Sequence, residues 1–409
     1  MWMVPLGNVL AAHGCGGLVP WAFSLGPLCA LVSPLFIGAL ADRRFEAQRL
    51  LTILCLVASA FLFLAFFGLG RGWGGTVFLA LLAAHQLCFA PTWSLVTAII
   101  LTHAPKPTRQ FPLLRVWATI SWILAGLAVS FVLAADVSPR TGMVAAGMLV
   151  ATALYAWRMP ATPPLAARSQ GRARGWRQSL GLDALDAFPK GDLRVFLVTY
   201  GLLAAPLAAF YPYAPQFIRA LGHEKAAALM TTGQVAETLS MVMLGWFLAR
   251  WRIKWVFGLG LAFAVLRYGS LAAAAAWPMA PLLVPGIAMH GLIYTFFFVT
   301  AQIYVEQRMD ATMRARVQAL LTTVNGGVGS LVGVLAAGWW HAVCVVPESS
   351  SPSGWAAFWG GLCLVVAVVA VYFLVGYRGG DGTGKHCRPV RGSGGRGRAC
   401  GMRHEAGGR

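Results

Sequence analysis

The chain has few charged residues and very few acidic ones. Of its 409 residues, 11% are charged and only 13 are Asp or Glu, whereas soluble globular proteins carry about 25% charged residues. Apolar residues make up 58% of the chain. They occur in long blocks, many of them near the roughly 20 residues that a helix needs to cross the hydrocarbon core of a bilayer. This composition excludes an ordinary soluble domain and predicts an all-helical membrane protein.

The sequence also lacks the short motifs of common enzymes and metal sites. It contains eight cysteines but no C-x-x-C, and it has no H-E-x-x-H, no G-x-S-x-G and no Walker loop. A bridge between Cys15 and Cys344 is conceivable, but structural thiols are the simpler interpretation. We therefore expect no cofactor, no metal and no enzyme. A membrane-embedded enzyme remains the least supported alternative.

Hydropathy predicts twelve membrane-spanning helices in two sets of six. The expected spans are 1–12, 18–40, 50–70, 74–102, 111–134, 141–158, 193–218, 226–249, 253–276, 280–304, 314–342 and 355–377. A basic, proline-containing stretch separates the two sets. The sequence thus predicts an N-terminal six-helix half at 1–158, a cytoplasmic linker at 159–192, a C-terminal six-helix half at 193–377 and a disordered basic tail at 378–409.

The first predicted span is short. Met1 lies directly in apolar sequence, and residues 1–12 fall below the roughly 20 residues of a complete span. The segment also lacks the basic region and the cleavage site of a signal peptide. We expect the first helix to be truncated here, with the native start upstream.

Positive charge is distributed unevenly among the connections. Most of the 32 Lys and Arg lie in alternate connections and in the tail. Because cytoplasmic loops retain positive charge, both termini and the linker should be cytoplasmic. The same bias explains the net charge of +19 without a nucleic-acid partner. The Gly/Arg-rich tail could bind RNA or anionic lipid, but no stacking aromatics accompany its arginines, so we expect a solvated tail.

A carboxylate lies near the middle of the predicted span 226–249. Glu237 follows Gln234 by three residues, so the two side chains share one face of a helix. An acidic group within the bilayer costs several kcal/mol unless it faces partners or water, and it marks a functional site by default. These two residues predict a polar pathway through the membrane.

Several stretches carry a resemblance to a known family. The layout of six plus six helices, with Asp42 and Arg43 in the loop after the second helix, resembles the major facilitator superfamily, in which this loop takes part in conformational change. Three stretches narrow the resemblance to the nucleoside:proton symporter family: Arg115-Val-Trp-Ala-Thr119 continuing to Trp122, Gly233-Gln-Val-Ala-Glu237-Thr238, and His290-Gly291 continuing through Phe296-Phe297 to Asn325-Gly326.

The resemblance implies that Arg115, Thr119, Trp122, Gln234 and Glu237 line a central substrate cavity. Helical spacing in the span 280–304 adds Tyr294 and Thr295 as candidate substrate-binding residues, and Tyr211 of the span 193–218 completes the set. Glu237 and His290 are the candidates for proton coupling. The chain departs from the family pattern at two of these positions, because Thr295 stands where relatives can carry Asp and Tyr211 stands where they can carry a polar amide. Arg267 is expected to be structural.

The resemblance therefore implies an importer of nucleosides in the cytoplasmic (inner) membrane of a bacterium, and we expect it to be a monomer. Proton symport with alternating access is the expected mechanism, and the expected partners are a nucleoside, protons and membrane lipid. The alternative is a facilitator or symporter for another polar neutral metabolite, such as a sugar. Competition between nucleosides and sugars for uptake separates the two hypotheses.

Overall fold

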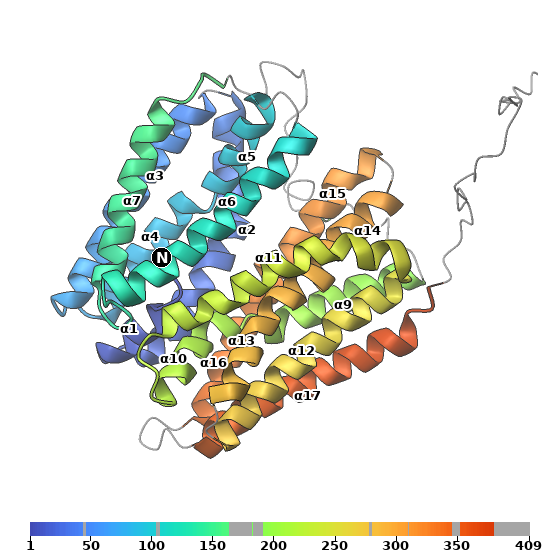
Figure 1. The fold of residues 1–409 in the computed structure, drawn as a ribbon. Coiled ribbons are helices and arrows are strands. Elements are labelled where there is room, and N and C mark those ends of the chain that lie inside the picture. Colours follow the sequence, from blue (N-terminus) through green and yellow to red (C-terminus); the bar gives the residue numbers. More distant parts are fainter. Residues whose placement is uncertain are drawn as a thin grey trace, which may run out of the picture.

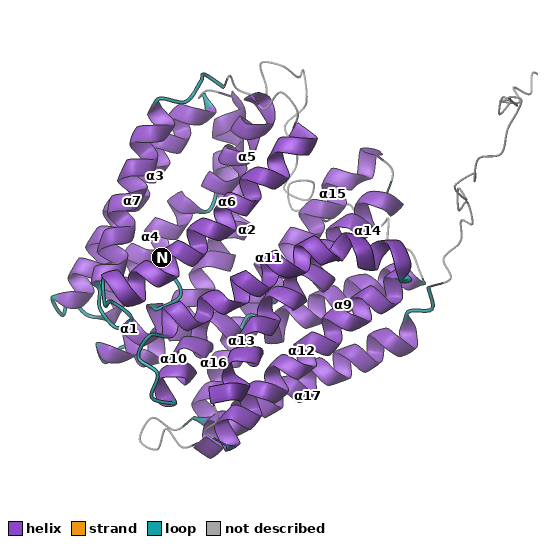
Figure 2. Ribbon diagram, in the orientation of Figure 1, coloured by secondary structure: helices purple, strands orange, loops and turns teal. Residues whose placement is uncertain are grey.

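The structure is a computed structural model that describes residues 1–43, 46–103, 107–162, 182, 191–277, 280–309, 311–345 and 352–379. Within these residues every regular element is a helix, as Figure 2 shows. The linker at 159–192 and the tail at 378–409 fall largely outside the described residues. Their boundaries stay predictions.

The described N-terminal part contains six helical segments, the first of them only seven residues long. They are formed by α1 (Leu6–Ala12), α2 (Val19–Arg43), α3 (Ala47–Gly70), α4 with α5 (Gly75–Phe89 and Thr92–His103), α6 with the π-helical η2 (Pro107–Leu127 and Ala128–Val132), and α7 (Arg140–Trp157); a 3₁₀ turn, η1 (Gly16–Leu18), follows α1. Pro91 separates α4 from α5, because a proline cannot donate the next helical hydrogen bond.

The C-terminal part repeats this arrangement within its own described residues. Its spans are α9 with α10 (Asp192–Leu207 and Phe210–Ala220), α11 (Ala226–Arg250), α12 (Ile253–Ala276), α13 with η5 and α14 (Ala280–Ile293, Tyr294–Val299 and Thr300–Arg308), α15 with η6 and α16 (Ala311–Thr322, Thr323–Gly329 and Ser330–Cys344), and α17 (Pro352–Gly376). The prediction of twelve helices in two sets of six is confirmed.

The two sets pack internally and meet along a narrower interface. In the N-terminal set α3 packs against α4 and α7, and in the C-terminal set α12 packs against α13 and α17. The sets meet where α6 crosses α11 and where α2 crosses α16. Figure 1 shows them approaching each other near α1, α10 and α16 and diverging toward α5 and α15.

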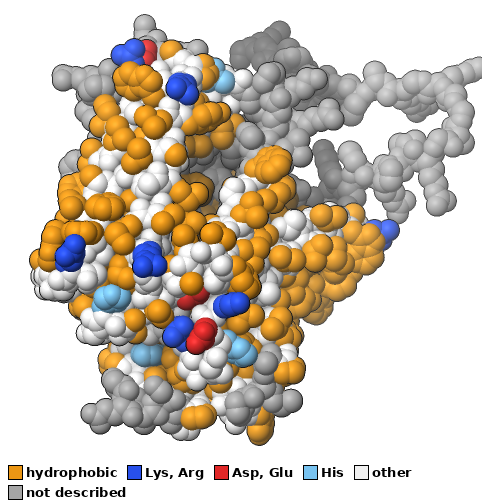
Figure 3. Space-filling view, turned by 60° about the vertical axis from the view of Figure 1, so that its left-hand side comes forward, with side chains coloured by type: hydrophobic (Ala, Val, Ile, Leu, Met, Phe, Trp, Pro, Cys, Tyr) orange, Lys and Arg blue, Asp and Glu red, His pale blue; other side chains and the backbone are white. Residues whose placement is uncertain are grey.

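The outer surface suits a lipid environment. Eight helical segments of the described chain are long and apolar enough to cross a membrane. Large apolar side chains such as Val242, Val368 and Leu154 are exposed on the helices. Hydrophobic side chains cover most of the face in Figure 3, where the few charged groups lie at the top and in the lower half of the view. α11 is not among the eight, because Gln234 and Glu237 lower its mean hydropathy.

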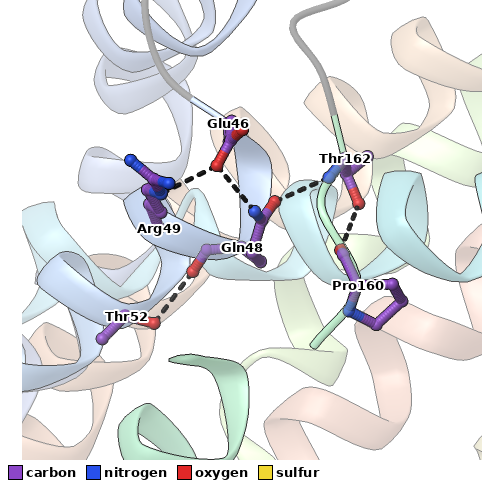
Figure 4. A network of polar contacts seen from close by, with 6 residues as sticks. All are labelled: Glu46, Gln48, Arg49, Thr52, Pro160 and Thr162. Atoms are coloured by element: carbon purple, nitrogen blue, oxygen red, sulfur yellow. Dashed lines mark hydrogen bonds and ion pairs between the residues drawn. The ribbon is translucent and has the colours of Figure 1, made fainter. Parts of the chain in front are cut away.

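A polar network joins the end of the N-terminal set to the start of α3 (Figure 4). Gln48, at the start of α3, accepts a hydrogen bond from the backbone N–H of Thr162 at 2.8 Å, and the Ala47 N–H donates to the Thr162 carbonyl at 3.0 Å. Gln48 also donates to Glu46, which forms an ion pair with Arg49 at 2.7 Å. The chain leaving α7 is thereby held against α3 up to residue 162.

Candidate substrate-binding site

A cavity of about 570 Å³ lies between the two sets of helices. Its walls come from α5 and α6 on one side, and from α9 to α13, η5, η6 and α16 on the other. Aromatic side chains from both sides contribute to it, including Trp93, Trp122 and Phe298. A cavity of this size with aromatic walls suits a small, partly planar ligand.

Most of the predicted site residues line this cavity. They are Thr119, Trp122, Tyr211, Gln234, Glu237, His290 and Tyr294. The backbone of Arg115 lies on α6 one turn before Thr119, and those of Asp42 and Arg43 end α2, but the side chains of these three residues are outside the described part of the structure.

Thr295 is the exception among the described candidates. Its side chain is fully buried and accepts a hydrogen bond from the Ser240 hydroxyl at 2.8 Å, away from the residues that line the cavity. An α-helix turns by roughly 100° per residue, so the neighbour of the cavity-lining Tyr294 points elsewhere. Thr295 thus connects η5 to α11.

A close helix contact sets the position of Glu237. Gly291 of α13 lies so near α11 that a Cβ at this position would overlap the backbone nitrogen of Glu237 and the carbonyl oxygen of Gly233. Glu237 itself is half-buried and faces the cavity. The absence of a side chain at Gly291 allows α11 and α13 to approach to this distance.

Arg267 of α12 was expected to be structural, yet it also lines the cavity. The guanidinium is 1% exposed, lies 3.9 Å above the centre of the Phe210 ring, and donates hydrogen bonds to His290 at 3.3 Å and to Tyr268 at 3.0 Å. The sequence shows that a cation lies within a span, and such a residue marks a functional site by default. The sequence does not show which side chains Arg267 contacts.

His290 and Tyr211 continue these contacts toward the cavity. The Tyr211 hydroxyl lies 2.9 Å from Nε2 of His290 and accepts a hydrogen bond from the Gln234 amide at 3.3 Å. The Tyr211 ring meets Trp122 of the opposite set edge to face, with the centroids 6.2 Å apart. Polar groups of α10, α11, α12 and α13 therefore converge beside an aromatic side chain of α6.

The site offers recognition groups for an uncharged, polar ligand. Gln234, Tyr211 and Thr119 can exchange hydrogen bonds, Glu237 can accept them from hydroxyl groups, and Trp122 gives a flat apolar surface. In the described part of the chain, no group of three or more His, Cys, Asp or Glu side chains has the arrangement of a metal site.

Two six-helix sets around a central polar cavity define a secondary membrane transporter of the major facilitator type. Residues 1–381 match the family model described as "Nucleoside H+ symporter". The chain therefore belongs to the nucleoside H⁺ symporter family.

Curated relatives agree with this assignment. The chain is 33% identical over 392 residues to the "Putative nucleoside transporter YegT" of Escherichia coli (strain K12), which covers 93% of this chain and 90% of the relative. It is 25% identical over 399 residues to the "Xanthosine permease" of the same organism, with 92% of each chain covered.

Solved structures show the same fold. The crystal structure of the nucleoside transporter NupG superposes with a TM-score of 0.78 at 22% identity, covering 91% of this chain and 94% of the other. The D-xylose-proton symporter gives a TM-score of 0.64 at 14% identity, covering 92% and 93%. At these identities the likeness concerns the fold alone.

Proposed function

We propose that this protein imports nucleosides together with protons by alternating access to the central cavity. Membership of the nucleoside H⁺ symporter family supports this function. The observation that carries the proposal is the convergence of Tyr211, Gln234 and Glu237 opposite Trp122 in one cavity between the two sets of helices.

The cavity residues divide the recognition of a nucleoside between them. Trp122 and Tyr294 provide aromatic surfaces for the base, and Gln234 and Tyr211 provide hydrogen-bonding groups at its edge. Glu237 accepts from the ribose hydroxyls, and Thr119 adds a hydroxyl on the opposite wall. Arg115 belongs to this proposal because it lies one turn before Thr119 on α6.

Glu237 is the group that we propose to carry the coupled proton. It is the one acidic side chain among the described residues that line the cavity. His290, the second candidate, has both ring nitrogens in hydrogen-bonding contact, with Arg267 and with Tyr211. Thr295 has no ionisable group and is buried against Ser240. Glu237 therefore combines exposure to the cavity with the ability to gain and lose a proton.

The wider setting follows from the charge distribution and the family. We propose that the protein acts as a monomer in a bacterial inner membrane, with both termini in the cytoplasm. We also propose that Asp42 and Arg43, at the end of α2, take part in the conformational change of transport. Apolar side chains on its surface support contact with lipid. It moves its substrate unchanged and is not an enzyme.

Uptake by the purified protein in lipid vesicles tests this function. We expect radiolabelled uridine to accumulate when the interior is alkaline relative to the outside, and to equilibrate without accumulation when the gradient is collapsed. Adenosine, cytidine and xanthosine compete, whereas xylose does not. The label is recovered from the vesicles as intact nucleoside.

The controls are vesicles without protein and vesicles with the Tyr155→Phe variant, whose substitution lies on an exposed part of α7. Uptake of xylose that nucleosides do not inhibit would favour the sugar hypothesis. Uridine uptake indifferent to the pH gradient would remove proton coupling and leave a facilitator.

A further inference from the structure

Hydrogen-bond accounting gives His290 a defined orientation and protonation pattern. Arginine has only donor groups, so Nδ1 of His290 must accept the hydrogen bond from Nη1 of Arg267 at 3.3 Å. A neutral imidazole that accepts at Nδ1 carries its hydrogen on Nε2. Nε2 of His290 therefore donates to the Tyr211 hydroxyl oxygen, 2.9 Å away.

Further contacts hold the side chains of Arg267 and His290 in place. Arg267 also donates to the Tyr268 hydroxyl at 3.0 Å, and that hydroxyl donates to the Pro206 carbonyl at 2.6 Å. The Phe210 ring stacks on His290 with centroids 5.0 Å apart and an interplanar angle of 17°, and the Arg267 guanidinium lies over the same ring. These contacts leave His290 little freedom to rotate.

Both acceptor positions of the Tyr211 oxygen are then in use. One receives the hydrogen from His290, and the other receives the Gln234 amide hydrogen at 3.3 Å. The hydrogen of the Tyr211 hydroxyl itself remains, and the Tyr211 side chain lines the cavity. Beside it, Oε1 of Gln234 is buried and has no hydrogen-bond partner in the described part of the structure. The donor that these contacts leave at the cavity wall is therefore the Tyr211 hydroxyl.

We propose that Arg267 and His290 are positioning residues that make Tyr211 a hydrogen-bond donor to the nucleobase. The Tyr211 hydroxyl donates its hydrogen to a carbonyl oxygen of the base. The three donors point the same way, from Arg267 through His290 to Tyr211, so each hydrogen bond polarises the next. Trp122, edge to face with Tyr211, keeps the base beside this hydroxyl. The inference rests on the proposed transport of nucleosides.

Thio-substituted uridines test the donor role of Tyr211. Sulfur is a weaker acceptor than oxygen, so the native protein should prefer uridine over 2-thiouridine or 4-thiouridine as competitors of uridine uptake, by about 3- to 10-fold for one neutral hydrogen bond. Tyr211→Phe should reduce this preference to about one. Tyr155→Phe, an exposed tyrosine on α7, should leave it at the native value.

Variants of His290 test the positioning role. His290→Leu should reduce the preference as Tyr211→Phe does, because the Tyr211 hydroxyl loses the donor that orients it. His290→Gln should retain the preference, because a glutamine can accept from Arg267 and donate to Tyr211. If the substitutions only impaired folding, uptake would fall in both variants, and the two variants would not differ in their preference for uridine over the thio-analogues.

The outcomes separate the two proposals. Failure of the native protein to take up uridine contradicts the proposed function. Uridine uptake without preference over either thio-analogue, or with a preference that persists in Tyr211→Phe, contradicts the inferred hydrogen-bond chain alone. An absent preference would mean that Tyr211 gives its hydrogen to Gln234 rather than to the substrate, and a preference that persists in Tyr211→Phe would mean that another group donates to the base.

Discussion

Glu237 is an acidic residue within a membrane span that faces the cavity rather than the lipid. Its side chain is half-buried, and it lies on a cavity wall rather than toward the lipid-facing side of α11, where Val235, Leu239 and Val242 are exposed. A carboxylate within a span is tolerated where it faces a polar cavity rather than lipid. In the proposed mechanism, a proton taken up there neutralises the one acidic side chain among the described residues that line the cavity.

We predict that Glu237→Gln abolishes accumulation driven by a pH gradient and retains exchange of nucleoside down its own gradient. Glutamine keeps the shape and one acceptor oxygen but cannot ionise. The measurement is uridine uptake and counterflow in vesicles with and without an imposed gradient. Glu224→Gln, a matched change at an exposed position before α11, should behave as the native protein. Native accumulation by Glu237→Gln would assign the proton to another group.

Single polar residues in apolar spans indicated from the sequence which helix faces line the cavity, but the residues next to them in the sequence did not. Thr119, Trp122, Gln234 and Glu237 reach the cavity wall, as their helical spacing and the family resemblance predict. The place of Thr295 was not predictable in the same way, because one position separates a residue facing the cavity from one packed on Ser240. The contacts of Arg267 could not be read from sequence, since they join residues of α10, α12 and α13.

At the scale of helices, the contact between α11 and α13 fixes the position of Glu237 at the cavity. We predict that Gly291→Ala strongly reduces transport, because its Cβ would overlap the backbone of Glu237 and Gly233 and force the two helices apart. Inserting a methyl group into a packed interface costs about 1–3 kcal/mol. The checks are uptake and thermal unfolding in detergent.

Gly245→Ala on α11, the other helix of this contact, is the matched control, because a Cβ there meets no atom within 4 Å. It should leave uptake and unfolding temperature near the native values. Equal effects of the two substitutions would show that the α11–α13 contact does not limit transport.

The beginning of α11 is capped from the other set of helices. The Asp136 carboxylate accepts from the Ala227 N–H at 2.7 Å, and the Ser130 hydroxyl of η2 accepts from the Ala228 N–H at 2.9 Å. Helix N-termini favour acceptors and negative charge, so these contacts stabilise the junction between the sets.

We predict that the unfolding temperature falls in the order native, Asp136→Asn, Asp136→Ala. Asparagine keeps an acceptor oxygen but loses the charge, and alanine loses both, at about 1 kcal/mol for the missing cap. Thermal unfolding of the purified variants measures the order, and Thr152→Ala, at an exposed hydroxyl on α7, serves as control. An unchanged temperature in Asp136→Ala would show that this cap does not stabilise the junction.

At the scale of the whole molecule, the two sets touch at the end where α1 meets α10 and η2 meets α11, and they diverge toward α5 and α15 (Figure 1). Asn8 of α1 donates to the Pro215 carbonyl of α10 across this junction, at 3.2 Å. An alternating-access cycle must open these contacts and close the opposite end.

We predict that a disulfide across the junction stops transport reversibly. In a variant without the eight native cysteines, Ser130→Cys and Ala228→Cys place two thiols where the native residues are already in hydrogen-bond contact. Oxidation should abolish uridine uptake and reduction should restore it. The two single-cysteine variants provide the control, and full uptake by the cross-linked protein would show that this junction stays closed during transport.

The twelve-helix architecture was predictable because hydropathy and charge alternate along the whole chain. The interruptions within the spans were less predictable. Pro91 predicts the division between α4 and α5. In contrast, no single residue predicts the π-helical segments η5 and η6, which depend on packing between helices distant in sequence. The interface between the sets likewise depends on pairs such as Asn8 and Pro215, which lie 207 positions apart.

The hydrogen bonds between Gln48 and Thr162 have a consequence for biogenesis. Every partner in this network belongs to the first 162 residues of the chain (Figure 4). Domains generally fold as units, the N-terminal one first, while the ribosome is still at work. The contact of the chain leaving α7 with α3 can therefore form before α9 is synthesised, because a nascent chain that ends at Thr162 already contains both of its sides.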